Sequence, residues 1–458
     1  MTALQRSPRP SRPLLLLFVA VMVAAASYVV APTLRSSASP GVVKQGAVPV
    51  PGAVAPVDDA GGAESAPDDR LPLAERGAFW AARVDARPDD FLSLVQLALV
   101  DAERARLTAD ISAYEQALGL VERSVAIVPA YPPTIRARAS IRFAIHDFGG
   151  ALADASSVLQ ALPTDPTALA ILGDAALELG RPEDAATAYD RLEATGPGPW
   201  LDVRRARLAY ATGNPARAVE LASRARTTAA TDDPMNAGFY AYAFGEFARL
   251  SGDADAARSG YESALRFRST DLGALVGLAR VEAAVGDEAG AMAHLHAAAA
   301  IAPQPETLEL LGDLLAAAGE AEAAEEQFAT VRLTGELSEL AGSVYDRQLV
   351  AFELDHGGAT EATLEAARSS LRARPDEAGH DLVAWALHRL GRDDEAAAEI
   401  GLAQAGGIVD ARILFHAGAI AIARGAESDG RGLLERARAL GPALDPRDAA
   451  EADALLRR

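Results

Sequence analysis

The sequence predicts an all-α protein in which about ten helix pairs stack into one long solenoid. Three observations support this fold class. A turn residue, usually glycine, returns every 33 to 39 residues through most of the chain. Prolines stand between the segments, where proline begins one helix or ends the helix before it. Half of the chain is hydrophobic but only 5% is aromatic, and the abundant alanine suits closely packed helices.

The repeat is counted on the residue that lies five positions before the first small residue of each second helix. These turn residues are His146, Gly180, Gly213, Gly252, Gly286, Gly319, Gly357, Gly391 and Gly425. The small residues that follow are Ala151, Ala185, Ala218, Ala257, Ala291, Ala324, Ala362, Ala396 and Gly430, with a weaker earlier copy at Ala117. Generic alanine-rich helices would not keep a step near 34, so the pattern predicts repeats from about residue 90 to residue 440.

The unit at residues 167–197 shows how one helix pair would pack. Large Leu169 and Leu172 precede small Gly173 in the first helix, and Ala185 precedes Tyr189 in the second. This order, closed by a proline, resembles the tetratricopeptide repeat (TPR) pattern. The resemblance implies a right-handed superhelix whose first helices line a concave groove, and a role in binding other proteins. One such unit cannot bury its own apolar face, so the copies must stack.

The N-terminal residues 1–35 are expected to be a signal anchor. Residues 14–31 carry no charge and just reach the length of a transmembrane helix. Three arginines precede them, and this orientation keeps the N-terminus in the cytoplasm. These arginines are Arg6, Arg9 and Arg12.

A cleaved signal peptide is the alternative, with an apolar core at residues 14–26 and cleavage before Ser27. Both alternatives place the repeats outside the cytoplasm. The uncleaved anchor is favoured because apolar residues continue through Val30. Residues 36–72 are rich in proline, glycine and alanine, which predicts a flexible tether between the anchor and the solenoid at residues 73–458.

Within the solenoid, residues 73–86 are expected to form an amphipathic capping helix with Phe79, Trp80 and Val84 on one side. The first pair is expected at 91–107 and 111–128, the last at 408–423 and 428–440, and a closing helix at 446–456. Two steps are long, and their extra residues fall near 231–238 and 333–343. They predict an extended loop or an added turn before the next first helix, on a face that often binds partners.

Charge and composition exclude several classes of function. The formal net charge is −21, although residues 1–35 carry four arginines and no acid. An acidic solenoid lacks the basic surface that nucleic acid requires, so no nucleic-acid partner is expected. The chain has no cysteine, which excludes disulfides, thiolate catalysis and cysteine-ligated metals.

No enzyme, cofactor or metal site is expected. The seven histidines do not stand at spacings that bring two onto one metal ion; His294 and His296, for example, point to different faces of a helix. No phosphate-binding glycine loop, calcium loop or nucleophile elbow occurs. The repeats extend to about residue 440 and leave no room for a catalytic domain.

The concave faces of repeats four to six are the candidate protein-binding site. They combine arginines with aromatic residues, which are the usual anchors of protein interfaces. The candidates are Trp200, Arg204, Arg207, Tyr210, Phe239, Tyr242, Arg249 and Arg280. The arginines oppose the overall negative charge, and this predicts an acidic segment of the partner. Alternatively, these side chains form solvated helix faces.

The sequence therefore predicts a TPR scaffold in the cytoplasmic membrane, single-pass, with its repeats extracytoplasmic and its concave face binding protein or peptide. The alternative function is a structural spacer or an assembly factor of an extracytoplasmic complex that acts through self-association or the convex face. The alternative location is secretion after signal cleavage. The identity of the partner does not follow from the sequence.

Overall fold

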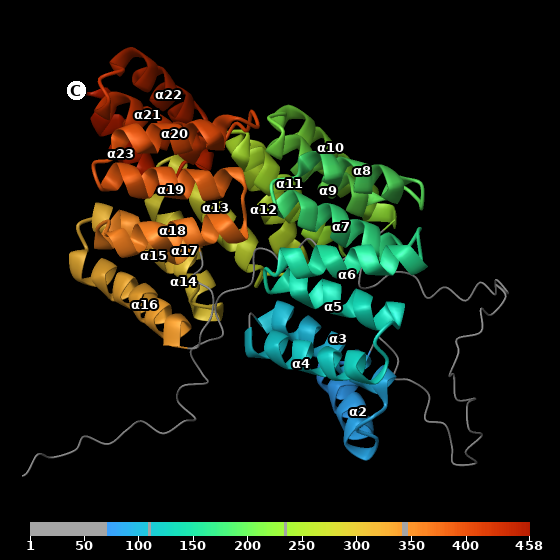
Figure 1. Cartoon of the computed structure of the whole chain (residues 1–458). Helices are drawn as coiled ribbons and strands as arrows, with labels where there is room; N and C mark the ends of the chain where they lie inside the picture. Colours follow the sequence, from blue (N-terminus) through green and yellow to red (C-terminus); the bar gives the residue numbers. More distant parts are fainter. Residues whose placement is uncertain (1–70, 109–110, 233–235, 341–346) are drawn as a thin grey trace, which may run out of the picture.

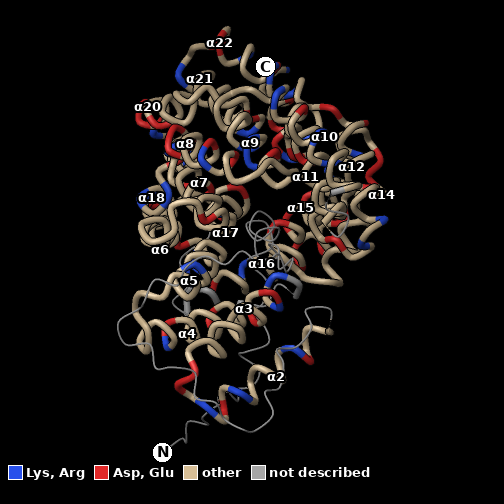
Figure 2. Tube along the Cα trace, turned by 90° about the vertical axis from the view of Figure 1, so that its right-hand side faces the viewer, with Lys and Arg blue, Asp and Glu red and all other residues tan. Residues whose placement is uncertain are grey.

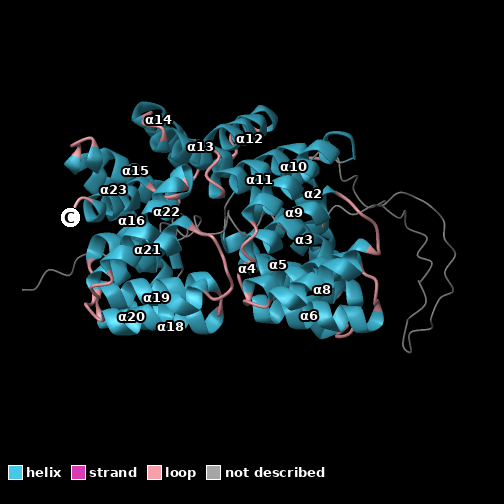
Figure 3. Cartoon of the chain, turned by 90° about the horizontal axis from the view of Figure 1, so that it is seen from above, coloured by secondary structure: helices cyan, strands magenta, loops and turns pink. Residues whose placement is uncertain are grey.

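The computed structural model describes residues 71–108, 111–232, 236–340 and 347–458. Throughout these ranges the regular structure is helical, and Figure 3 shows helices joined by short loops. The predicted anchor at 14–31 and nearly all of the tether at 36–72 lie outside the described residues. Among the described helices, none combines the length and the apolar character that a membrane span needs.

The described helices follow one another as antiparallel pairs, and each pair packs against the next. Helix α2 (Leu73–Ala86) precedes them, over the range that the sequence predicted, and packs on the first pair. The pairs are α3 (Phe91–Thr108) with α4 (Ile111–Ile127), α5 (Pro132–Ala144) with α6 (Phe148–Ala161), α7 (Pro166–Glu178) with α8 (Pro182–Glu193), α9 (Pro199–Ala211) with α10 (Pro215–Asp232), α11 (Ala237–Leu250) with α12 (Ala254–Phe267), α13 (Leu272–Ala284) with α14 (Glu288–Ile301), α15 (Pro305–Ala317) with α16 (Ala321–Leu340), α17 (Arg347–Phe352) and its π-helical continuation η4 (Glu353–Gly357) with α18 (Glu361–Ala373), α19 (Glu377–Arg389) with α20 (Asp393–Gln404), and α21 (Ala411–Ala423) with α22 (Glu427–Ala439).

The pair α7–α8 shows why these sequences form this unit. Asp165 caps α7 by accepting a hydrogen bond from the Ala168 amide at 2.8 Å, and Pro166 occupies the first helical turn. Where the helices cross, a Cβ built on Gly173 would lie 2.4 Å from the ring of Tyr189, so only glycine fits there. Tyr189 and Ala185 are fully buried at this crossing, as the sequence predicted.

The turn residues of the repeat adopt the left-handed conformation in nine pairs, which confirms the register at eight positions. Even His146, which is not glycine, has φ 64°. The remaining turn, which was expected at Gly357, differs by one residue, because the left-handed residue there is Gly358. The reason is η4, whose wider π-helical turn takes up one extra residue before the chain reverses.

The two long repeat steps are absorbed mainly by second helices. Among the residues that were expected to form a loop or an added turn, 231–232 and 333–340 form added helix that extends α10 to Asp232 and α16 to Leu340. The remaining extra residues at 233–235 and 341–346 lie outside the described residues. The described part of the added length therefore appears as extra turns of helix at the ends of α10 and α16.

The solenoid turns back on itself, so that its C-terminal pairs lie beside its middle pairs (Figure 1). Three successive turns of the earlier pairs each meet a linker of the later pairs. A Cβ on Gly180 would lie 2.3 Å from the Pro375 carbonyl oxygen, and a Cβ on Gly213 would lie 2.2 Å from that of Gly407. The next turn, at Gly252, approaches the backbone of Leu440. These glycines permit backbones almost 200 residues apart to touch.

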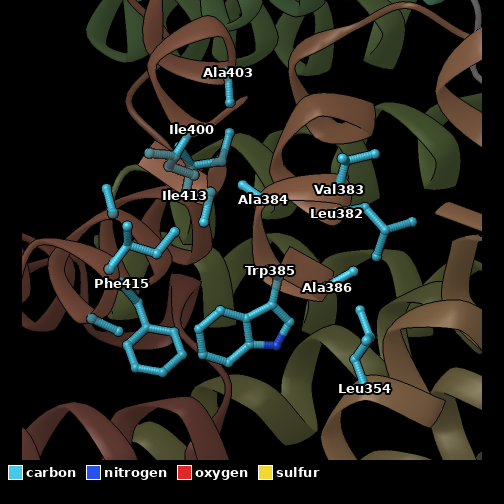
Figure 4. Close-up of a cluster of buried hydrophobic side chains, with 14 of the residues drawn as sticks. Leu354, Leu382, Val383, Ala384, Trp385, Ala386, Ile400, Ala403, Ile413 and Phe415 are labelled. Atoms are coloured by element: carbon cyan, nitrogen blue, oxygen red, sulfur yellow. The ribbon is translucent and has the colours of Figure 1, made fainter. Parts of the chain in front are cut away.

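The C-terminal helix α23 (Pro446–Leu456) forms over the predicted range, but it does more than close the last pair. Through α23 and the preceding 3₁₀ turn η5 (Gly441–Ala443), the C-terminal segment packs against α11, α13, α15, α21 and α22. It therefore links the end of the chain to the inner helices of the middle pairs. Beside it lies the largest apolar cluster, in which Trp385 is fully buried against Phe415 (Figure 4).

Candidate binding cavity

The return of the chain divides the solenoid into two superhelical turns, the earlier helix pairs and the C-terminal pairs beside them. A cavity of about 640 Å³ lies between these two turns of the solenoid. Its walls come from the first helices of the pairs, namely α9, α11 and α13 on one side and α17, α19 and α21 on the other, with α7 and α15 at its edges. The C-terminal segment contributes Ala443, Asp445 and Asp448. The inner face that the repeat pattern assigned to first helices is therefore present, but as a partly enclosed space and not as an open groove.

Six of the eight candidate residues from the sequence line this cavity. They are Arg207, Tyr210, Phe239, Tyr242, Arg249 and Arg280. Trp200 and Arg204 are not among its lining residues. No finding tests whether any of the eight contacts a partner, so that role stays a prediction.

Arg204 is a structural residue inside the repeat. It is 2% exposed, and its Nε donates to Asp174 Oδ2 at 3.0 Å. The other carboxylate oxygen of Asp174 accepts from the Tyr189 hydroxyl at 2.8 Å. Because removing one member of a buried pair leaves the other charge unpaired, this network stabilises the α7–α9 packing.

Glu178 joins the two turns of the solenoid. Its carboxylate accepts hydrogen bonds from Arg207 on α9 and from Arg374, which is 196 residues further along the chain. Burial acts to raise the pKa of Glu178, but the two guanidinium groups outweigh burial and hold the pKa below its usual value. Glu178 therefore stays ionised and acts as a bridge between distant repeats.

The other candidate arginines are paired in the same way. Arg249 donates to Glu246 at 3.0 Å and to the Pro442 carbonyl oxygen at 3.3 Å. Arg280 forms ion pairs of 2.8 Å with both Glu306 and Asp445. Figure 2 shows acidic positions on the neighbouring inner helices. The expected excess of positive charge is therefore absent from this face, because carboxylates from the same helix and from other repeats neutralise it.

Four buried donor atoms around this cavity nevertheless have no acceptor among the described residues. They are Nη1 of Arg207 and Nε of Arg249, Arg374 and Arg412. A buried N–H without an acceptor costs free energy, so these atoms favour a bound group that supplies oxygen acceptors. Phe239 and Phe247 are among the side chains that form the apolar part of the cavity wall.

A smaller recess of about 130 Å³ adjoins the cavity and shares Arg280, Arg412 and Asp448 with it. Here carboxylates outnumber arginines. The acidic lining residues are Glu306, Glu309, Asp313, Asp355, Asp445 and Asp448, against Arg280, Arg412 and Arg447. Sequence reasoning missed this recess, because its residues come from α15, η4, α21 and α23, which only the return of the solenoid brings together.

Burial raises the pKa of two carboxyls in the recess, and neighbouring acids add to the shift. Burial raises the pKa of Asp448 to about 6, although Arg412 acts in the opposite direction. Burial also raises the pKa of Glu309 well above its usual value, and the nearby Asp355 and Asp313 add to this effect. Asp355 itself has a lowered pKa, because Arg412 and Arg447 outweigh its burial.

Among the described residues, no group of three or more histidine and carboxylate side chains is arranged to hold a metal ion. The chain has no cysteine, so thiolate ligands are excluded throughout. The expectations of no cofactor and no catalysis remain predictions.

No protein-family model matches the sequence, and no curated protein matches it. Similar solved structures include a human IFIT1 dimer with PPP-AAAA, 13% identical, with a TM-score of 0.44 and coverage of 72% of this chain and 78% of that chain. A human IFIT1 dimer with m7Gppp-AAAA is 12% identical, with a TM-score of 0.45 and coverage of 74% and 78%. A tetratricopeptide repeat protein from Parabacteroides merdae ATCC 43184 is 17% identical, with a TM-score of 0.32 and coverage of 57% and 100%.

These values describe a distant likeness, and the assignment of the fold rests on the chain itself. The helix pairs, the left-handed turn residues and the glycine–tyrosine crossing of α7 and α8 are those expected of tetratricopeptide repeats. The described residues therefore form a TPR-like solenoid. Such repeats typically serve as scaffolds for interactions.

Proposed function

We propose that this chain is a membrane-tethered scaffold, without catalytic activity, that holds an extended segment of another protein in the cavity between its two turns. The observation that carries the proposal is the composition of that cavity. Aromatic and aliphatic side chains form part of its wall, while four arginines present buried N–H groups without acceptors among the described residues. An extended peptide can satisfy both parts of the cavity. Its side chains can pack against the apolar wall, and its backbone carbonyl oxygens can accept hydrogen bonds from the arginines.

The location is part of the proposal. The uncharged run at 14–31 would hold the protein in the cytoplasmic membrane, with the repeats on the extracytoplasmic side. Fractionation tests this. The full chain is expected to stay in the membrane after a high-salt wash, with its repeats open to protease from outside. A mature N-terminus at Ser27 would instead support secretion after cleavage.

Filling the cavity tests the binding proposal. Ala378 is exposed and lines the cavity, so Ala378→Trp would occupy space there without disturbing packed core. Purified full chain is panned against a library of displayed heptapeptides. Wild type is expected to enrich specific sequences, and Ala378→Trp to bind them at least tenfold more weakly at an unchanged melting temperature.

The matched control is Ala329→Trp, at an exposed position of α16 outside the cavity. It is expected to bind the selected peptides as wild type does. The proposal is wrong if no peptide is enriched, or if both tryptophan variants bind equally well. An oligonucleotide such as PPP-AAAA, which accompanies human IFIT1 in its structure, is a suitable probe for the prediction of no nucleic-acid partner.

A specific observation favours the assembly factor as the second candidate. Phe267 and Ile301 are 60% and 46% exposed, and they stand at the C-terminal ends of α12 and α14, the second helices of neighbouring pairs. Exposed apolar groups from neighbouring repeats often mark contacts between proteins. Self-association through this edge would leave the cavity free.

A further inference from the structure

The acid-rich recess next to the cavity has a charge balance that suits a cation. We infer that it receives the guanidinium or ammonium group of a basic side chain on the bound segment. The inference rests on the proposed function, since it names the chemistry of the segment that the cavity holds. It reverses the acidic partner that the sequence predicted.

The arginines of the recess are already engaged. Arg280 contacts Asp445 and Glu306, each at 2.8 Å. The carboxylate of Asp355 forms ion pairs with the guanidinium groups of Arg412 at 3.0 Å and Arg447 at 3.1 Å. The charge of all three arginines is therefore shared among carboxylates that already contact them.

Within the described part of the chain, Glu309 and Asp313 are the recess carboxylates without an arginine in ion-pair contact. The contact of Glu309 is His356 Nδ1 at 3.7 Å, and a histidine is charged only when protonated. Asp313 already contacts the other nitrogen of that ring at 2.8 Å. Burying an ionised carboxylate without a counter-ion is costly, so a cation entering the recess would gain this interaction.

His416 provides an independent observation that points to a hydrogen-bond donor on the ligand. It is 1% exposed, lines the cavity, and stacks on Trp385 with ring centroids 4.0 Å apart. Its Nδ1 lies 2.8 Å from Asp381 Oδ1, and an ionised carboxylate only accepts, so Nδ1 carries the proton. In neutral His416 the Nε2 is then an acceptor, and among the described residues it has no partner.

The unpaired groups around the cavity and the recess have opposite needs. The N–H groups of Arg207, Arg249, Arg374 and Arg412 need acceptors, while Nε2 of His416 in the cavity and the carboxylate of Glu309 in the recess need donors. A peptide with a lysine or arginine meets both needs, since its backbone supplies carbonyls and its side chain supplies charged N–H groups. The recess volume of about 130 Å³ suits one side-chain head group.

Proton release adds a second readout. Several groups face the carboxyls of Glu309 and Asp448. These groups are Asp313 from α15, Asp355 and His356 from η4, Arg412 and His416 from α21, and Asp445 and Arg447 from the C-terminal segment. The pKa of Asp448, about 6, leaves part of this carboxyl protonated near pH 6, burial raises the pKa of Glu309 as well, and an arriving cation favours the ionised form of both. Binding of a cation is therefore expected to release protons at pH 6 and fewer at pH 8.

The experiment uses the full chain and two probes. Agmatine, which carries a guanidinium and an ammonium group, is titrated by calorimetry at pH 6 and pH 8. The heptapeptide library is panned in parallel against wild type, Glu309→Gln and the matched control Glu326→Gln, which removes one exposed carboxylate of α16. Wild type and control are expected to enrich lysine or arginine at one position.

Glu309→Gln is expected to weaken agmatine binding at least tenfold and to lose the enrichment of basic residues. Glu306→Gln, also in the recess, serves as a second variant if Glu309→Gln does not fold. Proton release is measured in buffers of different ionisation enthalpy and is expected only where agmatine binds.

The outcomes separate this inference from the proposed function. Peptides enriched without any basic preference would overturn the inference and leave the peptide-binding proposal standing. Agmatine binding that depends on Glu309, without any enriched peptide, would support the cation site and identify a free amine as its source, while overturning the peptide proposal. Agmatine binding of equal strength in wild type and Glu309→Gln, or no binding at all, would overturn the cation site.

Discussion

The arginine-rich wall of the cavity and the acid-rich recess beside it use charge in different ways. On the wall, Glu178 binds Arg207 and Arg374 and so connects helices of distant repeats, while Glu246 pairs with Arg249 on the same helix. In the recess, six carboxylates share three arginines, and Glu309 is left beside a histidine. Paired buried charges hold the fold together, whereas a buried surplus of one sign marks a place for a ligand.

The largest effect is expected at the buried pair behind the wall. Asp174→Ala leaves Arg204 without its carboxylate and Tyr189 without its acceptor, so the free energy of unfolding is expected to fall by about 3–5 kcal/mol. Urea unfolding followed by circular dichroism measures it. Asp190→Ala, at an exposed surface pair with Arg205, is the control and is expected to change stability by less than about 1 kcal/mol. Equal effects of the two substitutions would show that the buried network is not special.

A smaller effect is expected where the wall joins the two turns. Glu178→Gln keeps the size of the side chain but removes the charge between Arg207 and Arg374, at an expected cost of about 1.5–3 kcal/mol. Amide hydrogen exchange should then rise in both α7 and the segment near Pro375, because the contact between turns opens. Glu183→Gln on the outside of α8 is the control. Exchange that rises in α7 alone would mean that Glu178 does not couple the turns.

In the recess, loss of a carboxylate is expected to raise the free energy of unfolding, whereas on the wall it lowers it. Burial raises the pKa of Asp448 to about 6, whereas a free aspartate titrates near about 3.9. Between these values the folded protein holds a proton that the unfolded chain has lost, so stability falls as pH rises from about 4 to about 6. Asp448→Asn should remove this fall and be more stable than wild type above pH 6, by about 1–3 kcal/mol.

Unfolding in urea at pH 4.5 and pH 7.5 checks this sign, with Asp429→Asn on the exposed face of α22 as the control. In the variant, Arg412 and Arg447 still form ion pairs with Asp355, so neither arginine is left without a carboxylate. An Asp448→Asn variant less stable than wild type at pH 7.5 would mean that this carboxylate is paired like those of the wall.

The smallest effect on stability is expected at the outer edge. Phe267→Ser and Ile301→Ser alter exposed side chains, so the free energy of unfolding should change by about 0.5 kcal/mol or less. If the assembly function is correct, these substitutions reduce self-association in analytical ultracentrifugation and leave peptide binding intact. A monomeric wild type would remove the support for that alternative.

The sequence alone determined the repeating unit. Glycine at the turns, small residues at the crossings and proline at the joints are local requirements, and each pair meets them within about 34 residues. For this reason Gly173 and Tyr189 were recognisable as packing partners. Even the shift from Gly357 to Gly358 arises locally, from one π-helical turn that glycine spacing does not reveal.

The tertiary structure decided what the inner face became. Arg207 is basic in the sequence, but its charge is cancelled by Glu178, which also binds Arg374 from a distant repeat. The recess needs Glu309, Asp355 and Asp448, whose separation along the chain hides any motif. Local patterns specify how each helix pair packs, whereas the return of the solenoid depends on small rotations between pairs that accumulate over many repeats. Those rotations decide which distant charges meet, and with them the sign of the ligand that the cavity favours.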